Sequence, residues 1–329
     1  MERAIQRLSY YMKFGGIKLP IMKVMDKLCG THKTDEYIYN VSIKASPDKY
    51  AYLLSLIYGM KLGKKLNLEN PQTFNEKIQW LKLYDTTELK TQLADKWRVR
   101  EWVAQKIGVQ YLIPLLGVWN SFDEIDLERL PNRFVLKTNH ASGANVIVLD
   151  KQTHDWHSTK IKFEKWMEQN FAYLHGFELQ YKDIKPKIIA EEYIETKAGN
   201  LYDYKRYCFN GVPKYIAIIG DRVLEKHTGQ TAFYNTDWKL QSFDSGDYPR
   251  YKIQKKKPDK LEEMLFLAKK LSKGFSFVRV DLYELDNGEV KFGELTFTPG
   301  NGMFRWIPEK VDLMFGEKII LPKHISMPY

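Results

Sequence analysis

The sequence predicts an α+β fold in which a mostly helical N-terminal part precedes a mixture of helices and antiparallel strands. Helical spacing of apolar residues dominates up to about residue 110, and after it β-branched and aromatic runs alternate with helices. Asn-Gly dipeptides at 210–211 and 287–288 each stand between two strand-like runs. Such dipeptides are typical of hairpins, which join antiparallel strands, so a doubly wound parallel sheet is disfavoured.

The first clear helix start follows Thr73. Thr73 and Glu76 form a T-x-x-E capping box, and Phe74, Ile78 and Leu81 recur at helical spacing. Three further helices are expected, over 88–107, 158–171 and 258–273.

Strands are expected where short runs rich in β-branched and aromatic residues lie between turn residues. Five such runs come before the last helix, at 133–138, 145–150, 187–194, 203–209 and 213–220. Two longer runs, 275–285 and 289–297, flank the second Asn-Gly dipeptide.

The composition is that of a folded globular protein, with 44% hydrophobic residues in a chain of 329. The two cysteines, Cys29 and Cys208, lie far apart, which argues against a disulfide framework and for a reducing compartment. Glu2, Arg3 and Arg7 interrupt the N-terminal apolar pattern, so neither a signal peptide nor a transmembrane span is expected. A cytoplasmic protein is therefore predicted.

The net charge of +10 is spread along the chain, without zinc-finger spacing or an RNP-type aromatic motif. Nucleic acid is therefore not expected as a partner, and phosphate-rich small substrates or an anionic membrane surface explain the charge equally well. Ile5, Leu8 and Met12 share one helical face near basic residues. An ordinary packed helix is the simpler interpretation, and peripheral association with the inner face of the membrane is the alternative.

The hairpin around 287–288 brings two carboxylates together. A two-residue turn at Asn287-Gly288 places residue 281 opposite 294 and residue 279 opposite 296. Because side chains alternate along a strand, one face then carries Arg279, Asp281, Glu294 and Thr296.

Directly opposed like charges destabilise a sheet, so a bound cation is the simplest remedy. Carboxylate oxygens suit Mg²⁺, which usually arrives with the phosphates of a nucleotide. Arg279 offers another explanation, because it would neutralise an acid on the same face without any metal.

Other chemistry-bearing residues lie at strand ends. Lys137 precedes the small-residue loop 138–145, which contains Ser142 and Gly143 and would let backbone N–H groups approach phosphate, although a plain hairpin loop explains it too. Asp203 and Lys205 share one face of a strand, which fits ribose and phosphate binding or a structural ion pair.

The order of these motifs resembles the ATP-grasp superfamily: Asp95-Lys96, Lys137 before its loop, the acidic strand end, Asp-x-Lys, then R-V-D…E-x-T-x-x-P-G. More narrowly, four motifs look like the TupA-like ATP-grasp proteins of teichuronopeptide and other polysaccharide biosynthesis. These motifs are NPQTFNEKIQWLKLYD, LADKWRVREWV, RFVLKTNHASG and GELTFTPGNG.

The resemblance implies roles for the residues that match. Lys96 and Lys137, with the loop of Ser142 and Gly143, would contact ATP phosphates. The adenine hinge would be formed by Glu191, Glu192, Tyr193 and Ile194. Asp203 would meet the ribose, and Arg279 and Lys205 would be the catalytic cations. Mg²⁺ would be held by Asp281, Glu294 and Thr296, where threonine replaces the usual asparagine; water or Asn301 is the alternative third ligand.

The resemblance also implies an activity and a domain plan. We expect an ATP-dependent carboxylate–amine ligase that joins an amino acid or similar amine to a uronic-acid carboxyl through an acyl phosphate. A glycosyltransferase and a non-catalytic nucleotide-binding protein are the alternatives. The expected domains are a helical region at 1–110, to whose first 65 residues no role is assigned, and an ATP-grasp domain at 111–329. This domain would comprise subdomains at about 120–190 and 191–329.

Overall fold

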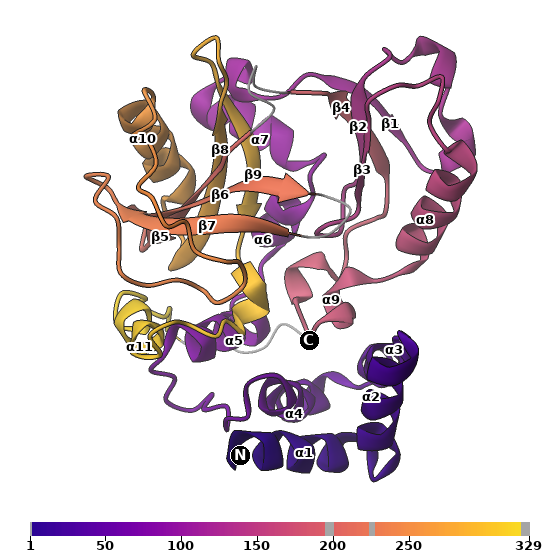
Figure 1. Ribbon diagram of the computed structural model, residues 1–329, viewed down its shortest axis with the longest axis vertical. Helices are drawn as coiled ribbons and strands as arrows, with labels where there is room; N and C mark the ends of the chain where they lie inside the picture. Colours follow the sequence, from indigo (N-terminus) through magenta and orange to yellow (C-terminus); the bar gives the residue numbers. More distant parts are fainter. Residues whose placement is uncertain (1, 195–200, 224–227, 324–329) are drawn as a thin grey trace. The chain divides into compact units, whose positions relative to one another are not determined.

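The computed structural model describes residues 2–194, 201–223 and 228–323 (Figure 1). Its chain forms two compact units. Unit 1 comprises Met1–Thr87, Asn170–Lys182 and Thr298–Tyr329, and unit 2 comprises Glu88–Gln169 and Asp183–Phe297. Residues 88–110, which the sequence grouped with the N-terminal helical region, therefore belong with the sheets of unit 2. The mixture of helices with antiparallel sheets confirms the predicted α+β class.

The first sheet of unit 2 has four antiparallel strands in the order β1-β4-β2-β3. Its strands are β1 (Leu115–Trp119), β2 (Phe134–Thr138), β3 (Asn145–Val148) and β4 (Ile188–Glu192). Helix α8 (Trp156–Glu168) lies along one face, where its Phe163 joins the buried cluster of Phe134 and Ile188. Lys137 and Glu191 alternate with these core residues and so lie on the opposite face.

The second sheet of unit 2 has five antiparallel strands in the order β7-β6-β5-β8-β9. Its strands are β5 (Asp203–Phe209), β6 (Val212–Val223), β7 (Thr228–Asn235), β8 (Phe277–Glu284) and β9 (Val290–Thr296). Helix α10 (Leu261–Ser272) covers one face of it with Met264, Leu267 and Leu271 (Figure 1). The side chains of β5, β8 and β9 that point away from α10 form the second, polar face.

The β8–β9 hairpin differs from its prediction at the tip. Leu285 N–H donates to Glu289 O and Gly288 N–H to Leu285 O, both at 2.9 Å, so three residues form the loop instead of two. Gly288 adopts the left-handed conformation (φ 80°) that such a loop needs. Further along, Gly293 has no partner between the pairs 282↔292 and 281↔294, which is a β-bulge. The bulge offsets the longer loop, and the predicted pairing of 281 with 294 is confirmed.

The single helix expected over 88–107 is wrong: it is divided into α6 (Glu88–Ala94) and α7 (Val99–Ile107). The Asp95 carboxylate accepts hydrogen bonds from the backbone N–H groups of Trp97 (2.8 Å) and Arg98 (3.1 Å). A side chain that binds nearby backbone donors in this way competes with helical hydrogen bonding. Lys96 is thereby left in a turn between the two helices.

Unit 1 is built mainly of helices (Figure 1). They are α1 (Glu2–Gly15), α2 (Lys18–Cys29), α3 (Lys33–Ile43), α4 (Tyr50–Leu62), α5 (Phe74–Tyr84), α9 (Phe171–Leu174) and α11 (Lys310–Gly316). The predicted capping box of Thr73 and Glu76 is present at the start of α5. Phe74 is fully buried against Trp306 and Phe315, with ring centroids 5.7 and 5.9 Å apart. Segments far apart in sequence thus share one aromatic core.

Two further findings concern membranes and the N-terminal helix. Across the described ranges, no helix has both the length and the apolar character needed to cross a bilayer. Helix α1 is packed, as the simpler interpretation predicted, through Arg7 and Tyr10 against α4. Ile5, Leu8 and Met12, however, are exposed and do not form the packed face.

Candidate functional site

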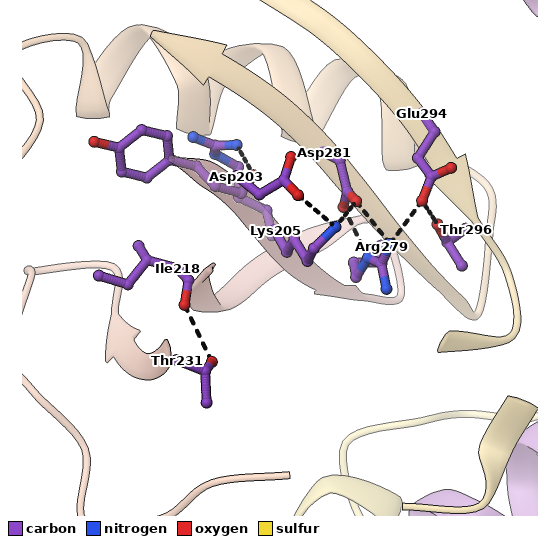
Figure 2. Close-up of polar contacts among 10 residues, drawn as sticks. Asp203, Lys205, Ile218, Thr231, Arg279, Asp281, Glu294 and Thr296 are labelled. Atoms are coloured by element: carbon purple, nitrogen blue, oxygen red, sulfur yellow. Dashed lines mark hydrogen bonds and ion pairs between the residues drawn. The ribbon is translucent and has the colours of Figure 1, made fainter. Parts of the chain in front are cut away.

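The polar face of the second sheet carries the predicted carboxylate pair. Asp281 on β8 lies opposite Glu294 on β9, and Arg279 lies between their side chains (Figure 2). Arg279 Nε and Nη2 donate to Asp281 Oδ1 and Oδ2 at 2.8 and 2.7 Å, and Nη2 also donates to Glu294 Oε1 at 2.8 Å. Thr296 Oγ1 donates to the same Glu294 oxygen at 2.9 Å. In this structure Arg279 therefore neutralises the two acids, as the interpretation without a metal predicts.

Strand β5 adds a second cation and a third acid to this face. Lys205 pairs in register with Asp281, and its Nζ lies 2.6 Å from Asp281 Oδ2 and 3.4 Å from Asp203 Oδ2 (Figure 2). The neighbouring Arg206 points to the other side of the strand and is completely buried, where its guanidinium contacts Met264 Sδ at 2.6 Å. Strand alternation thus separates a basic residue of the polar face from one of the core.

The charges on this face set the ionisation of Glu294. Burial would raise the pKa of Glu294, but Arg279, Lys205 and Lys96 lower it to about 2. Burial would likewise lower the pKa of Arg279, and the adjacent Asp281 and Glu294 raise it instead. Both groups are therefore charged at neutral pH. The acids of this face are paired with the cations Arg279 and Lys205, and Lys96 adds a further positive charge nearby.

On the first sheet, Lys137 and Glu191 meet across β2 and β4. Lys137 Nζ donates to Glu191 Oε2 at 2.5 Å, and Arg100 Nη1 from α7 donates to Glu191 Oε1 at 2.9 Å. Arg100 is fixed by a further hydrogen bond to Ile113 O at 2.8 Å. One carboxylate therefore holds two basic side chains on the face of the sheet opposite α8.

Lys96 lies within electrostatic range of both sheets. Burial lowers the pKa of Lys96 below its ordinary value; Lys137 adds to this shift, and Glu294 and Glu191 oppose it. Its backbone N–H donates to Asn139 O at 3.0 Å, and its Nζ donates to Ala141 O. Lys96 thus contacts the small-residue loop and is influenced by acids from β4 and β9.

That loop and the end of β4 complete the predicted nucleotide residues. Ser142 and Gly143 are exposed at the tip of the loop, and Gly143 is in the left-handed conformation (φ 74°). Glu192 is exposed, and its N–H is bonded to Pro114 O at 3.0 Å. Tyr193 and Ile194 follow the strand. The Arg133 guanidinium lies 4.5 Å from the centroid of the Tyr193 ring.

A model of TupA-like ATP-grasp proteins matches residues 76–320. This match covers well over half of the chain. The chain belongs to the TupA-like ATP-grasp family. Among curated proteins, none matches the chain significantly.

Solved structures similar to this TupA-like chain include three ligases or synthetases. The L-amino acid ligase from Bacillus licheniformis has 14% identity and a TM-score of 0.40, over 63% of this chain and 43% of that one. N5-carboxyaminoimidazole synthetase from Staphylococcus aureus complexed with ADP has 14% identity and a TM-score of 0.39, over 71% and 54%. D-alanine–D-alanine ligase from Bacillus anthracis complexed with ATP has 16% identity and a TM-score of 0.35, over 62% and 55%. The chain spans about half the length of these proteins.

The donor set of this TupA-like chain fits a magnesium ion that arrives with a nucleotide. In the part of the chain that the structure describes, no group of three or more His, Cys, Asp or Glu side chains is arranged to hold a metal ion. Mg²⁺, however, commonly takes only one or two carboxylates together with substrate phosphates. Asp281 and Glu294 supply such oxygens, although Arg279 is bonded to both.

The alternative ligand Asn301 makes its hydrogen bonds within unit 1. Asn301 is in unit 1, where its side chain accepts a hydrogen bond from Lys82 Nζ and donates one to His175 O. Its backbone N–H donates to Thr298 O at 2.9 Å. Burial lowers the pKa of Lys82 to about 7, although nearby Glu178 opposes the shift. The side-chain amide of Asn301 is therefore bonded at both its oxygen and its nitrogen.

Sequence reasoning missed Arg100 and Tyr283. Arg100 belongs to the motif LADKWRVREWV that also contains Lys96, and this was the signal available for it. Tyr283 carries no such signal. Tyr283 is half-buried and its phenol interacts with Asp203, and desolvation with the nearby acids raises its pKa well above the usual value.

Proposed function

We propose that this protein is an ATP-dependent carboxylate–amine ligase that activates a carboxylate as an acyl phosphate and then forms an amide. The observation that carries the proposal is the Asp281–Glu294 pair, held by Arg279 and Lys205, with the charge of Lys96 near enough to help lower the pKa of Glu294. Phosphoryl transfer depends mainly on positioning and on neutralising charge, which such a cluster provides. Membership of the ATP-grasp family supports the same reaction class.

We assign the nucleotide phosphates to Lys96, Lys137 and the loop of Ser142 and Gly143. Lys137 would exchange its bond to Glu191 for one to phosphate, while Arg100 remains on that carboxylate. The exposed loop supplies backbone N–H groups, which suit phosphate oxygens.

We assign adenine to the chain segment that follows β4. Because the Glu192 N–H is bonded to Pro114, the adenine contacts of the hinge 191–194 would fall mainly to Tyr193 and Ile194. Asp203 would bind the ribose.

In the first step, a substrate carboxylate oxygen attacks the γ-phosphorus and ADP leaves. Asp281 and Glu294, with Thr296 as a weaker third ligand, would hold Mg²⁺, which when bound neutralises phosphate charge. Lys205 would neutralise the remaining negative charge on this face when Asp281 also binds Mg²⁺.

In the second step, an amine nitrogen attacks the acyl carbon, phosphate leaves, and the nitrogen loses one proton. Arg279 would stabilise the oxyanion of this tetrahedral intermediate. Its present bonds to both acids show that its charge can be compensated when no substrate is bound.

For the substrates we propose an amino acid or similar amine and the carboxyl of a uronic-acid sugar destined for a surface polysaccharide such as a capsule. This assignment is supported by the resemblance to TupA-like proteins, which supply the polysaccharide context. The carboxylate and amine are small-molecule partners, in keeping with the dispersed positive charge.

The test is product analysis with ATP, Mg²⁺, a panel of uronic-acid sugars and nucleotide sugars, and pooled amino acids. Release of ADP and phosphate that requires both a carboxylate and an amine, with a new amide product by mass, would establish the ligase. Turnover of a nucleotide sugar without ATP would overturn it in favour of a glycosyltransferase.

Matched variants locate the chemistry. Asp281→Asn and Glu294→Gln should each abolish turnover with the fold intact by circular dichroism, and Lys137→Ala should chiefly weaken ATP binding. Glu289→Gln, in the exposed part of the same hairpin, is the control and should retain activity. Near-normal turnover in Asp281→Asn or Glu294→Gln would contradict the metal assignment.

A further inference from the structure

Helix α1 directs an apolar stripe away from the protein. Its inner face is fixed to α4: the Tyr10 ring occupies the space beside Gly59, where a Cβ would lie 2.4 Å away, and Arg7 Nε donates to Met60 O at 2.8 Å. On the opposite face, Ile5, Leu8 and Met12 are 63%, 49% and 49% exposed. Their i, i+3, i+7 spacing places them in one line along the helix.

Helix α2 repeats this arrangement. It packs through Leu19 and Asp26, which are 1% and 7% exposed and two helical turns apart. Half a turn around the helix axis, its outer face carries a second apolar stripe. The stripe consists of Ile17, Ile21, Val24, Met25 and Leu28, which are 69%, 56%, 59%, 50% and 74% exposed.

These two stripes are concentrated in a small part of the sequence. Among the described residues, 22 large hydrophobic side chains are exposed, and eight of them lie between Ile5 and Leu28. Scattered apolar side chains are normal on a protein surface, but contiguous ones mark an interaction site. We call these eight residues of α1, α2 and the position before α2 the N-terminal apolar face.

The charges around this face are predominantly positive. Residues 1–29 contain six Lys and Arg against two acids, Glu2 and Asp26. Asp26 is turned inward, where it accepts hydrogen bonds from Thr31 Oγ1 and from the backbone of residues 33 and 34. The exposed lysines that remain beside the stripes are Lys13, Lys18 and Lys27, whereas Lys23 lies 3.8 Å from the Asp35 carboxylate of α3.

We propose that α1 and α2 bind the surface of an anionic phospholipid bilayer through the N-terminal apolar face. Helices with an outward apolar stripe and flanking lysines lie in the plane of the lipid headgroups, with the lysines on anionic lipids. A second copy of the chain is a poorer occupant, because a symmetric contact would bring like charges together. The family match begins at residue 76, so the eight residues of this face lie outside the matched part of the sequence.

The experiment is co-sedimentation of the full chain with vesicles, without ATP or substrates. Vesicles of phosphatidylcholine and phosphatidylglycerol in equal parts should bind the protein, and vesicles of phosphatidylcholine alone should bind it on the order of a hundredfold more weakly, at about 1 kcal/mol per lysine. Added salt should weaken binding because it screens the lysines. Absence of binding to the anionic vesicles would overturn the proposal, whatever the outcome of the ligase assay.

Variants test the face directly. Leu8→Ser with Leu28→Ser should reduce binding about tenfold or more, since the variant loses two buried leucine side chains at the lipid surface. The matched control is Ile253→Ser with Phe266→Ser, two exposed apolar residues of unit 2, and should bind as the unaltered protein does. Equal loss in the control would refute the assignment. So would light scattering that finds a dimer of the unaltered chain and a monomer of the Leu8/Leu28 variant.

Discussion

Replacing Arg279 by glutamine tests how the two carboxylates of the hairpin tolerate each other. Arg279 donates two hydrogen bonds to Asp281, at 2.8 and 2.7 Å, and one to Glu294, at 2.8 Å. In Arg279→Gln the buried Asp281 loses a bidentate partner and keeps Lys205 at 2.6 Å. We expect a less stable protein, because the negative charge of Asp281 is balanced by Arg279 and Lys205 in the unaltered chain and by Lys205 alone in the variant.

The size of the effect follows from burial and from what remains. Removing one partner of a buried ion pair typically costs about 3–5 kcal/mol. Lys205 still neutralises part of the Asp281 charge, so the lower end applies, about 3 kcal/mol at neutral pH. The Glu294 side chain is 34% exposed, so its share is only ~1 kcal/mol or less.

Urea-induced unfolding of four proteins measures this: the unaltered chain, Arg279→Gln, Glu294→Gln and the double variant. Because the two side chains are in contact, the double variant should lose less stability than the sum of the two single losses. A single Arg279→Gln loss below about 0.5 kcal/mol, the size of an ordinary surface substitution, would refute the reasoning. If the carboxylates bind Mg²⁺, the added ion should raise the free energy of unfolding of Arg279→Gln more than that of the unaltered chain.

Three further predictions concern local features. Thr73→Ala removes the capping box of α5 and should lower the free energy of unfolding by about 1 kcal/mol, whereas Thr73→Ser should not. Gly293→Val places a Cβ 3.2 Å from the Asp281 carbonyl oxygen, so it should shift β9 and abolish ATP turnover with circular dichroism unchanged; full activity would count against the bulge. Glu294 has a folded pKa of about 2 against an ordinary 4.5, so its charge stabilises the protein above pH 4.5 and this stabilisation disappears as pH falls toward 2. The difference in unfolding free energy between the unaltered chain and Glu294→Gln should therefore shrink over that range, and a constant difference would contradict the lowered pKa.

The hairpin shows how far sequence reasoning reached. The pairing of Asp281 with Glu294 could be predicted because β-branched runs and an Asn-Gly dipeptide define the strands. The loop was one residue longer than predicted, and the bulge at Gly293 shifted the register back. A glycine within a strand is the only signal for such a bulge, and it does not specify the change in register.

Other features depend on tertiary contacts that periodicity does not contain. The break between α6 and α7 comes from the Asp95 side chain, which binds two backbone donors inside an otherwise helical pattern. Strands β1 and β7 were not predicted, because apolar and polar residues alternate only weakly along them. Their pairing with β4 and β6, which the sequence pattern does not contain, makes them strands. The apolar spacing of α1 was correct, but the buried face is the one that carries Arg7 and Tyr10.

The interleaving of the two units along the chain determines which of them can form first during synthesis. Unit 2 is complete once residues up to Phe297 have been made, whereas unit 1 still lacks its third segment. Until residues 298–316 follow, Phe74 lacks its partners Trp306 and Phe315, and Asn75 lacks the carboxylate of Asp312. A nascent chain that stalls in this interval exposes the apolar side of α5, which makes it a target for chaperones and prone to aggregation.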